Sequence, residues 1–592
     1  GSPGPRYWQQ RADYVINVEL NDGNQSLSGS ENITYYNNSP ETLKYLWLQL
    51  DQNILAKDNL TSKSENTTMR DSLPVKAIAE NLALYDFDGG YKIKAVKDAA
   101  GKALPYFINY TMMRVDLPQP LTTGQKYTFT VEWSYNIGDR MKDGQRSGYE
   151  YFPDDGNYVY TIAQWFPRMC VFDDVNGWQN KQFLGQGEFA LPFGDYKVKI
   201  TVPADHIIAS TGALKNAKEV LTATELGRYE KAKTTFDKPV IIITQSEATA
   251  KEKTKATTKK TWEFHADNVR DFAFASSRKF IWDAVAVKIG SKTPLAQSYY
   301  PKEGNPLWEQ ESTKAVKNAL VTYSKYTIDY PYPHATSVHA ASIGMEYPMI
   351  CFNYGRPDAD GTYSDAVKYG MISVIIHEVG HNFFPMIVNS DERQWTWMDE
   401  GLNTFMQFMA EQEWDRNYPS RRGPAHKIVP YMRSEKHLLE PIMTNSENII
   451  QFGPNAYAKP ATALNILRET VMGRELFDYA FRQYAQRWMF KHPTPDDFFR
   501  TMEDASAVDL DWFWRGWFQY NWRLDQGINS IKYVKNDPKL GAVISIENFD
   551  KMAMPIILDV KTKSGKITRI KLPVEIWQRN IDWSFKHNST EE

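Results

Sequence analysis

The sequence contains little cysteine, since Cys170 and Cys351 are the only two in 592 residues. So few thiols exclude a disulfide-stapled scaffold and a cysteine-rich zinc module. The two cysteines could form one disulfide with each other, but we expect two buried thiols instead. Long apolar runs are also missing, because none reaches the roughly 18 to 20 residues that a membrane-spanning helix needs.

An excess of either charge is missing as well, because 69 Lys and Arg residues face 72 Asp and Glu residues. The resulting net charge of -3 creates no field that would attract nucleic acid or an anionic membrane. The 42% of hydrophobic residues is typical of a globular protein and does not favour disorder. A chain of this length exceeds one hydrophobic core and predicts roughly two to four domains.

The start of the chain shows no charged segment followed by an apolar segment, and therefore no secretion signal. The first residues, GSPGP, resemble a cloning remnant, so an export signal would already have been removed. Several Asn-x-Ser/Thr strings suit an exported protein. We therefore expect a soluble protein in the periplasm or outside the cell.

The period of the hydrophobic residues changes twice along the chain. Up to residue 284, alternating stretches such as YTFTVEWSY (127–135) predict a β-rich N-terminal domain. Over residues 285–525, helical spacing dominates, as in LWEQESTKAVKNALVTYSKY (307–326). Over residues 526–592, short strand patterns predict a small β-sandwich-like module, and whether this module is truncated is left open.

The string HEVGH, residues 377–381, places two histidines four positions apart. The segment MISVIIHEVGH has no proline or turn signal, so it predicts one helix with His377 and His381 on one face. Both imidazoles can then bind one metal ion. A catalytic zinc also needs a third protein ligand and an open position for water. Glu400 begins the next helical pattern, and a second helix packed on the first would bring it close.

Two further motifs accompany these residues: SIGMEYP at 342–348, and AYAKP, which contains Tyr457. HEVGH, eighteen intervening residues, Glu400 in WMDEG and these two motifs together resemble the signature of the aminopeptidase N family. This family of gluzincin zinc peptidases also contains leukotriene hydrolase. The resemblance extends over most of residues 14–521, and the terminal module lies outside it.

The resemblance implies a multidomain α+β protein, with a saddle-like β domain before a thermolysin-like, mainly helical catalytic domain. It implies that His377, His381 and Glu400 bind one zinc ion per chain. Glu378 would then be the general base that moves a proton from the attacking water to the leaving amine. Tyr457 would donate a hydrogen bond to the oxyanion that develops during the attack.

The SIGMEYP segment carries the substrate-binding residues that the resemblance implies. Glu346 matches the family glutamate that binds the free α-amino group of the substrate, which restricts cleavage to the first residue. Gly344 and its neighbour Met345 would let the backbone lie close to an extended peptide. Ile343 and Tyr347 stand where the family commonly has Gly and Asn.

A second amine-binding residue is expected from the β domain, where the family has a Gln-aromatic-Glu-like string. The nearest string here is AQWFPR, with Phe166 at the matching position and Gln164 two residues before it. Gln164 is therefore the candidate for the second anchor. Without an acidic residue at position 166, exopeptidase specificity could be relaxed.

The leading hypothesis is a zinc aminopeptidase that hydrolyses N-terminal residues from peptides by metal-activated water. A zinc endopeptidase of the same fold is the first alternative, because the second amine anchor is altered. A non-catalytic, peptide-binding envelope protein is the second, although every expected catalytic residue is present. The expected partners are peptides with a free N-terminus, and nucleic acid is not among them.

Overall fold

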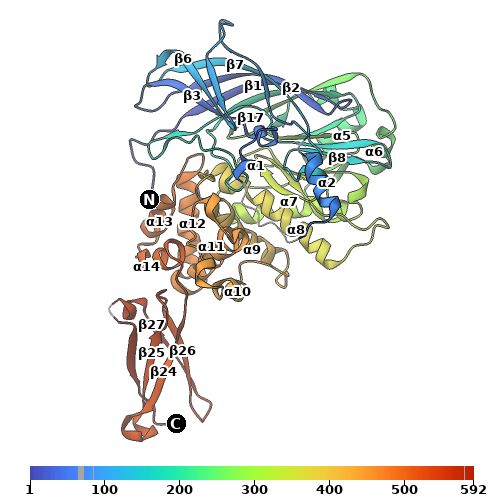
Figure 1. The fold of residues 1–592 in the computed structure, drawn as a ribbon. Coiled ribbons are helices and arrows are strands. Elements are labelled where there is room, and N and C mark those ends of the chain that lie inside the picture. Colours follow the sequence, from blue (N-terminus) through green and yellow to red (C-terminus); the bar gives the residue numbers. More distant parts are fainter. Residues whose placement is uncertain (65–71, 85, 579) are drawn as a thin grey trace.

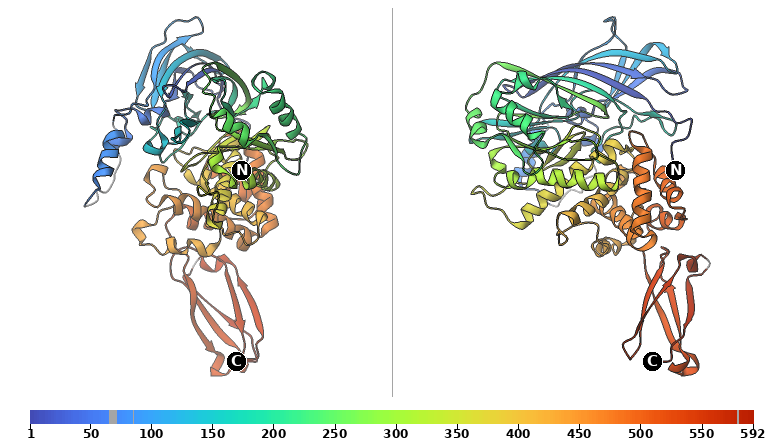
Figure 2. Two further views of the ribbon diagram at one scale, coloured as in Figure 1. Left: turned by 90° about the vertical axis from the view of Figure 1, so that its right-hand side faces the viewer. Right: turned by 180° about the vertical axis from the view of Figure 1, so that it is seen from behind.

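The computed structural model describes residues 1–64, 72–84, 86–578 and 580–592. Three regions follow one another along the chain (Figure 1): a β-rich region, a region of helices packed on a sheet, and a small β module that projects away from both. The predicted multidomain α+β fold class is confirmed. Figure 2 shows the same separation from two further sides, with helix α2 (Val75–Leu84) projecting from the flank of the β region.

The β-rich region is built on a seven-stranded sheet whose order is β15-β17-β13-β1-β2-β7-β4. In the central strand β1, every second residue is buried, from Ala12 to Leu20, as a sheet with one covered face requires. β1 runs antiparallel to β2 and parallel to β13. The strands are β1 (Arg11–Asn21), β2 (Ser26–Tyr36), β4 (Lys92–Asp98), β7 (Lys126–Asn136), β13 (Gly194–Pro203), β15 (Ala213–Leu214) and β17 (Lys259–Val269).

Two four-stranded sheets and a short strand pair complete this region. Their orders are β10-β3-β6-β5, β14-β18-β9-β8 and β11-β12. The strands are β3 (Leu43–Gln49), β5 (Tyr106–Asn109), β6 (Met112–Leu121), β8 (Gly148–Phe152), β9 (Asn157–Ile162), β10 (Arg168–Met169), β11 (Phe172–Asp173), β12 (Gly177–Trp178), β14 (Ile207–Ser210) and β18 (Phe274–Ser277). The short helices are α1 (Thr61–Ser64), α3 (Arg140–Asp143), α4 (Ala217–Val220), α5 (Ala223–Ala232) and α6 (Gln245–Lys251).

The second region contains a six-stranded sheet of order β16-β19-β20-β21-β23-β22. Its strands are β16 (Val240–Ile243), β19 (Ile281–Ala286), β20 (Leu295–Tyr300), β21 (His334–His339), β22 (Gly344–Tyr347) and β23 (Ile350–Asn353). The sequence boundary between residues 284 and 285 falls inside β19, and β16 lies before it. This sheet therefore draws strands from both sides of that boundary.

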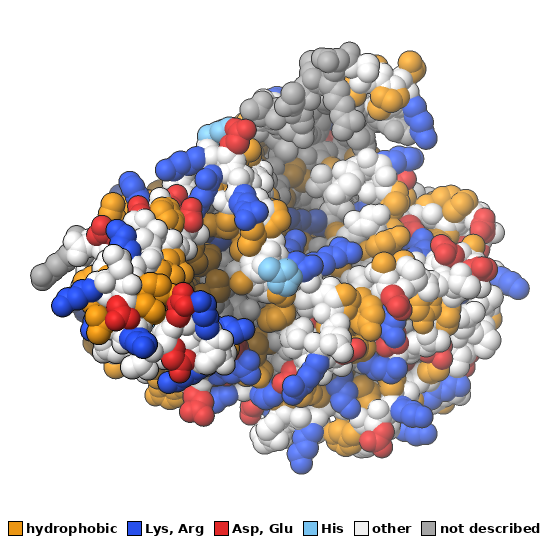
Figure 3. All heavy atoms as spheres, turned by 90° about the horizontal axis from the view of Figure 1, so that it is seen from below, with side chains coloured by type: hydrophobic (Ala, Val, Ile, Leu, Met, Phe, Trp, Pro, Cys, Tyr) orange, Lys and Arg blue, Asp and Glu red, His pale blue; other side chains and the backbone are white. Residues whose placement is uncertain are grey.

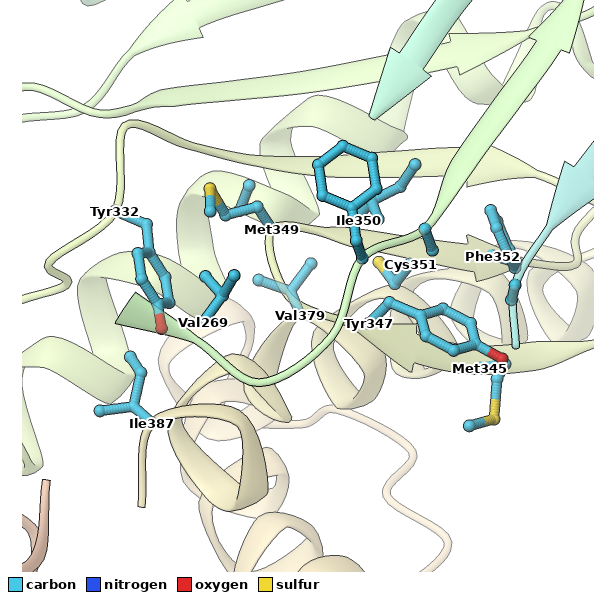
Figure 4. Close-up of a cluster of buried hydrophobic side chains, with 14 of the residues drawn as sticks. Val269, Tyr332, Met345, Tyr347, Met349, Ile350, Cys351, Phe352, Val379 and Ile387 are labelled. Atoms are coloured by element: carbon cyan, nitrogen blue, oxygen red, sulfur yellow. The ribbon is translucent and has the colours of Figure 1, made fainter. Parts of the chain in front are cut away.

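Helices cover the sheet and extend beyond it. They are α7 (Leu307–Tyr326), α8 (Asp365–Gly380), α9 (Leu402–Trp414), α10 (Val429–Met432), α11 (Lys459–Ile466), α12 (Arg474–Trp488), α13 (Pro495–Ser506) and α14 (Asp511–Trp514). Figure 4 shows buried side chains of β23, among them Ile350 and Cys351, next to Val379 of α8. This apolar packing holds the helix with the HEVGH motif against the strands that carry the GMEYP segment.

The C-terminal module has a three-stranded sheet, β24-β25-β28, and a strand pair, β26-β27. Its own core is small and centres on Ile544, Ile546 and Ile576. The strands are β24 (Gln526–Tyr533), β25 (Ala542–Asn548), β26 (Ile556–Lys561), β27 (Ile567–Leu572) and β28 (Asp582–His587).

On the face of the molecule seen in Figure 3, charged side chains of both signs are scattered, in agreement with the near-zero net charge.

The two cysteines are free and buried, as predicted, with 0% of Cys170 and 1% of Cys351 exposed. Burial raises the pKa of both thiols well above the usual range. In the part of the chain that the structure describes, no helix combines the length and the apolar character that a membrane crossing requires.

Candidate active site and metal centre

Helix α8 and the helical turn η4 (Trp397–Gly401) bring the two HEVGH histidines and Glu400 together. His377 Nε2 lies 2.9 Å from Glu400 Oε2 and 3.0 Å from His381 Nε2. His381 Nε2 lies 3.3 Å from the same Glu400 oxygen. Two ligands that each stand about 2.1 Å from a tetrahedral zinc are about 3.4 Å apart. These two nitrogens and one oxygen therefore fit zinc in both donor type and spacing.

Glycine at position 380 allows the two helices to approach. A Cβ atom added at Gly380 would lie 2.1 Å from the Tyr323 hydroxyl and 2.3 Å from Asn403 Oδ1, so no side chain fits there. Asn403, on α9, donates from Nδ2 to the His377 carbonyl oxygen at 2.8 Å and accepts from the Tyr323 hydroxyl at 2.7 Å. The second helix is therefore locked onto the first, with Glu400 just before it.

The outer nitrogen of each candidate ligand histidine has an oxygen partner. His377 Nδ1 lies 2.8 Å from Gln407 Oε1, and His381 Nδ1 lies 2.9 Å from both the Phe384 carbonyl oxygen and Asp399 Oδ1. Such partners fix the ring orientation and leave Nε2 for the metal, as is usual in zinc sites. Gln407 was not predicted from the sequence, although its position seven residues after Glu400 places it two helical turns along the same face.

Glu378 lines the cavity beside the three candidate ligands. Burial is the largest cause that raises the pKa of its carboxyl group, to about 8, and the charge of Glu400 also raises this pKa. A cation bound by the neighbouring ligands would favour the ionised form and lower this pKa. Gly344 comes so close that a Cβ atom there would lie 2.5 Å from Glu378 Oε1. Strand β22 therefore passes directly over the candidate general base.

Tyr457 closes the other side of the metal centre. Its hydroxyl donates to Glu400 Oε1 at 2.5 Å, and its ring centroid lies 5.7 Å from that of His377. The guanidinium of Arg422 lies 4.2 Å from the centre of the same ring. The Tyr457 hydroxyl therefore lies directly beside the candidate metal ligand Glu400.

Glu346, on β22, is 2% exposed, and its Oε1 has no hydrogen-bond partner within the described residues. Burial raises the pKa of this carboxyl group well above its ordinary value. One carboxylate oxygen of Glu346 lies within 4.8 Å of oxygens of Glu188, Glu392 and Asp399. Carboxyl groups this close together repel one another when ionised, so a cation bound among them would be favourable.

Glu188 comes from the loop between β12 and β13 and lines the same cavity. Its Oε1 lies 2.7 Å from Arg146 Nη2, whereas its Oε2 has no hydrogen-bond partner among the described residues. Glu188 was not predicted from the sequence. The only signal was one charged residue in the otherwise uncharged stretch GQGEFALPF.

Gln164 is not brought to the cavity lining. Its side-chain oxygen accepts a hydrogen bond of 2.6 Å from the Tyr347 hydroxyl. Phe166, at the position that matches the family acid, is 1% exposed and packs edge-on against Tyr14. In this structure Glu188, rather than Gln164, is the residue of the β-rich region that faces Glu346.

The cavity has a volume of about 850 Å³, within the range typical of small-ligand sites. Both the β-rich region and the helical region contribute side chains to it. Its charged and aromatic lining includes Arg146, Glu188, Glu346, Glu378, Arg422 and Tyr457. Met345, predicted to bind substrate, also lies in the lining, together with Gly344.

Residues 311–517 match the peptidase family M1 domain. Among curated proteins, the mitochondrial aminopeptidase 2 of Saccharomyces cerevisiae is 23% identical over 284 residues, which are 45% of this chain and 30% of the yeast protein. The glutamyl aminopeptidase of Homo sapiens is 26% identical over 145 residues, 23% of this chain and 15% of the human protein. The chain therefore spans less than a third of the length of these relatives.

The fold is similar to that of an M1 zinc metallopeptidase from Deinococcus radiodurans, with a TM-score of 0.56 at 15% identity. The superposition covers 86% of this chain and 93% of that one. A mutant of the same metallopeptidase, solved with a Tyr-Ser-Ala substrate, has a TM-score of 0.54 at 15% identity, over 86% of this chain and 93% of that one. At this identity the similarity shows the fold.

Proposed function

The chain belongs to the aminopeptidase N family, whose M1 peptidase domain it carries over residues 311–517, and we propose that it is a zinc aminopeptidase acting on peptides. The observation that carries this proposal is the meeting of two features in one cavity. The zinc-type donor set of His377, His381 and Glu400 lies beside the buried carboxyl group of Glu346. A carboxylate beside the metal donors selects substrates whose amine is free.

His377, His381 and Glu400 would hold one zinc ion per chain, which when bound lowers the pKa of a water molecule toward neutrality and polarises the scissile carbonyl. Glu378 accepts a proton from the attacking water and delivers it to the leaving amine. The water oxygen adds to the carbonyl carbon, and the peptide C–N bond then breaks as the leaving nitrogen accepts the proton from Glu378. Tyr457, whose hydroxyl now contacts Glu400, donates to the oxyanion during this attack.

Glu346 and Glu188 would bind the α-amino group of the substrate from two sides. The free oxygens of these two buried carboxyl groups, Glu346 Oε1 and Glu188 Oε2, supply the acceptors that an ammonium group needs. An internal peptide bond cannot offer this charge, so it would leave both acceptors unpaired at a cost in transition-state stability. This pair supports aminopeptidase action over endopeptidase action.

The names of the relatives agree with a peptide substrate, since those compared above are aminopeptidases and the Deinococcus radiodurans structure was solved with a peptide. We further propose that peptides reach this protein outside the cytoplasm, as the Asn-x-Ser/Thr strings suggested. Comparison of culture fractions by immunoblotting would test this localisation.

Hydrolysis of a panel of aminoacyl fluorogenic amides beside their N-acetylated counterparts tests the proposed activity. We expect cleavage of the free-amine members alone, loss of cleavage with a zinc chelator, and recovery on addition of Zn²⁺. Glu378→Gln is the control, because it removes the proton-transfer group and should lower kcat by about 10²- to 10⁴-fold while zinc remains bound.

Three outcomes would contradict parts of the proposal. Equal cleavage of acetylated substrates would identify an endopeptidase. Full activity of Glu378→Gln would remove this residue from the mechanism. Absence of cleavage by zinc-loaded protein would favour a non-catalytic peptide-binding protein.

A further inference from the structure

Arg422 places a guanidinium group in the cavity without a hydrogen bond or an ion pair to any described residue. It is half-buried, and it lies on the loop 415–424 between α9 and the short helical turn that begins at Ala425. Its guanidinium carbon lies 4.2 Å from the centre of the Tyr457 ring. Such a group keeps its five N–H donors available for an anion.

The two other arginines of this cavity that are not exposed each have an oxygen partner among the described residues. Arg146 pairs with Glu188 at 2.7 Å, and Arg140 donates to the Ala341 carbonyl oxygen at 2.6 Å. Arg421, beside Arg422, also lines the cavity but is exposed. Arg422 is therefore the half-buried arginine of the cavity that has no hydrogen bond or ion pair with a described residue, and its charge reaches the carboxyl group of Glu411 only from beyond ion-pair distance.

A series of contacts leads from the carboxyl group of Glu346 through the candidate metal ligands to Arg422. Ligand atoms of Glu346 and His381 lie within 4.8 Å of each other, and His381 contacts Glu400 at 3.3 Å. Glu400 accepts from Tyr457, on whose ring Arg422 rests. The cavity thus has an acidic part and a basic part, separated by the groups that would hydrolyse the peptide.

We propose that Arg422 binds the C-terminal carboxylate of short peptides, so that di- and tripeptides are the preferred substrates. This inference rests on the aminopeptidase function proposed above. Each extended residue spans about 3.5 Å, so the carboxylate of a dipeptide lies about 3.5 Å beyond the scissile bond and that of a tripeptide about 7 Å beyond it. A planar guanidinium next to the metal centre matches a carboxylate in charge and geometry.

Tripeptides with a free carboxylate and the same peptides ending in an amide test this inference, with kcat/KM as the readout. The wild-type protein should prefer the free acid about tenfold to one-hundredfold, the range expected for a hydrogen bond between two charged groups. Arg422→Gln should reduce this ratio to near one, and Arg422→Lys should keep part of it. Arg416→Gln, a change at an exposed arginine on the same loop outside the cavity lining, should keep the full ratio.

The outcomes separate this inference from the activity on which it rests. Equal, chelator-sensitive cleavage of both peptides by the wild-type protein would overturn the carboxylate subsite and leave the aminopeptidase standing. An equal loss on both peptides in Arg422→Gln would show that Arg422 acts through Tyr457 instead. If no peptide were cleaved, both the activity and the subsite would fail. Circular dichroism would verify that each variant is folded.

Discussion

At the scale of single residues, burial decides how the carboxyl groups of this protein behave. Burial raises the pKa of both Glu378 and Glu346, and the charge of Glu378 raises the pKa of Glu346 further. Two neighbouring buried acids favour a state in which they share one proton. A substrate ammonium group beside Glu346 would favour ionisation of that carboxyl group. Glu378 would then no longer share a proton with Glu346 and could exchange its proton with the attacking water.

Asp283 lies on β19, four strands away from β22 in the sheet. Its buried carboxyl group allows the effect of burial on a pKa to be measured as a change of the free energy of unfolding with pH. Burial raises the pKa of Asp283 to about 7 from 3.8, although Thr313 and Tyr300 donate hydrogen bonds to it. Between about pH 4 and pH 7 the folded state therefore binds more protons than the unfolded state, so stability falls as pH rises through this window.

Asp283→Asn should remove this dependence, because the amide cannot ionise and can still pair with both hydroxyl groups. We expect the difference in thermal midpoint, variant minus wild type, to increase from pH 4.5 to pH 7.5. The gain at neutral pH should be on the order of a few kcal/mol. Thermal unfolding at several pH values measures it, and a constant difference would contradict the role of Asp283.

At the scale of secondary-structure elements, the edge strand β22 determines the space above Glu378. Gly344→Ala would place a methyl group 2.5 Å from Glu378 Oε1 and 3.2 Å from Val374 Cγ1, so the carboxylate must move. We expect kcat to fall by about tenfold to one-hundredfold, since misplaced catalytic groups are costly. Zinc content and thermal midpoint should change little.

A matched control is Gly370→Ala, because Gly370 lies on α8 about two helical turns before His377. Gly370 also lines the cavity, yet no atom lies within 4 Å of a Cβ atom added there. Activity should therefore be kept in this variant. Equal kinetics of Gly344→Ala and the wild type would show that the contact with Glu378 has no catalytic importance.

The parts of the site that could be predicted from the sequence are those set by local geometry. His377 and His381 are four residues apart on one helix, and the helical period alone puts them on one face. Glu400 follows on the next helix, so a short connection brings it close. Glu188 could not be predicted, because only tertiary packing of a loop from another region brings it to Glu346.

The same distinction explains the fold. Alternating burial in β7 and helical spacing in α7 follow from neighbouring residues, and both segments were predicted. The membership of β16 in the six-stranded sheet depends on pairing with β19, about forty residues along the chain. Strand pairing over such a distance leaves no periodic mark in the sequence.

At the scale of the whole molecule, Arg393 joins the helical region to the β-rich region. Its Nη2 lies 2.9 Å from Asp51 Oδ1 and donates to Gln49 Oε1 at 2.9 Å. Its Nε donates to the carbonyl oxygen of Glu188. One buried side chain thus connects the metal-binding region to the loop that carries the proposed amine anchor.

Arg393→Met should loosen this connection while it fills a similar volume. We expect a loss of about 3 kcal/mol in stability, because buried acceptors lose their charged donor. KM for free-amine substrates should rise, since the Glu188 loop is less fixed, whereas zinc content should persist. Thermal unfolding and steady-state kinetics measure both effects, with the exposed Arg416→Met as control. An unchanged KM would show that Arg393 does not fix the position of the Glu188 loop.

Because both cysteines are buried, we expect no thiol of the folded protein to react with thiol-specific reagents. Since only the thiolate reacts and both thiols are shielded with a raised pKa, maleimide reagents should leave the folded chain unmodified. A pair of cysteines introduced on the surfaces of the β-rich and helical regions could then be labelled selectively with a donor and an acceptor dye. Such a protein would report the distance between the two halves of the cavity while peptides bind and leave.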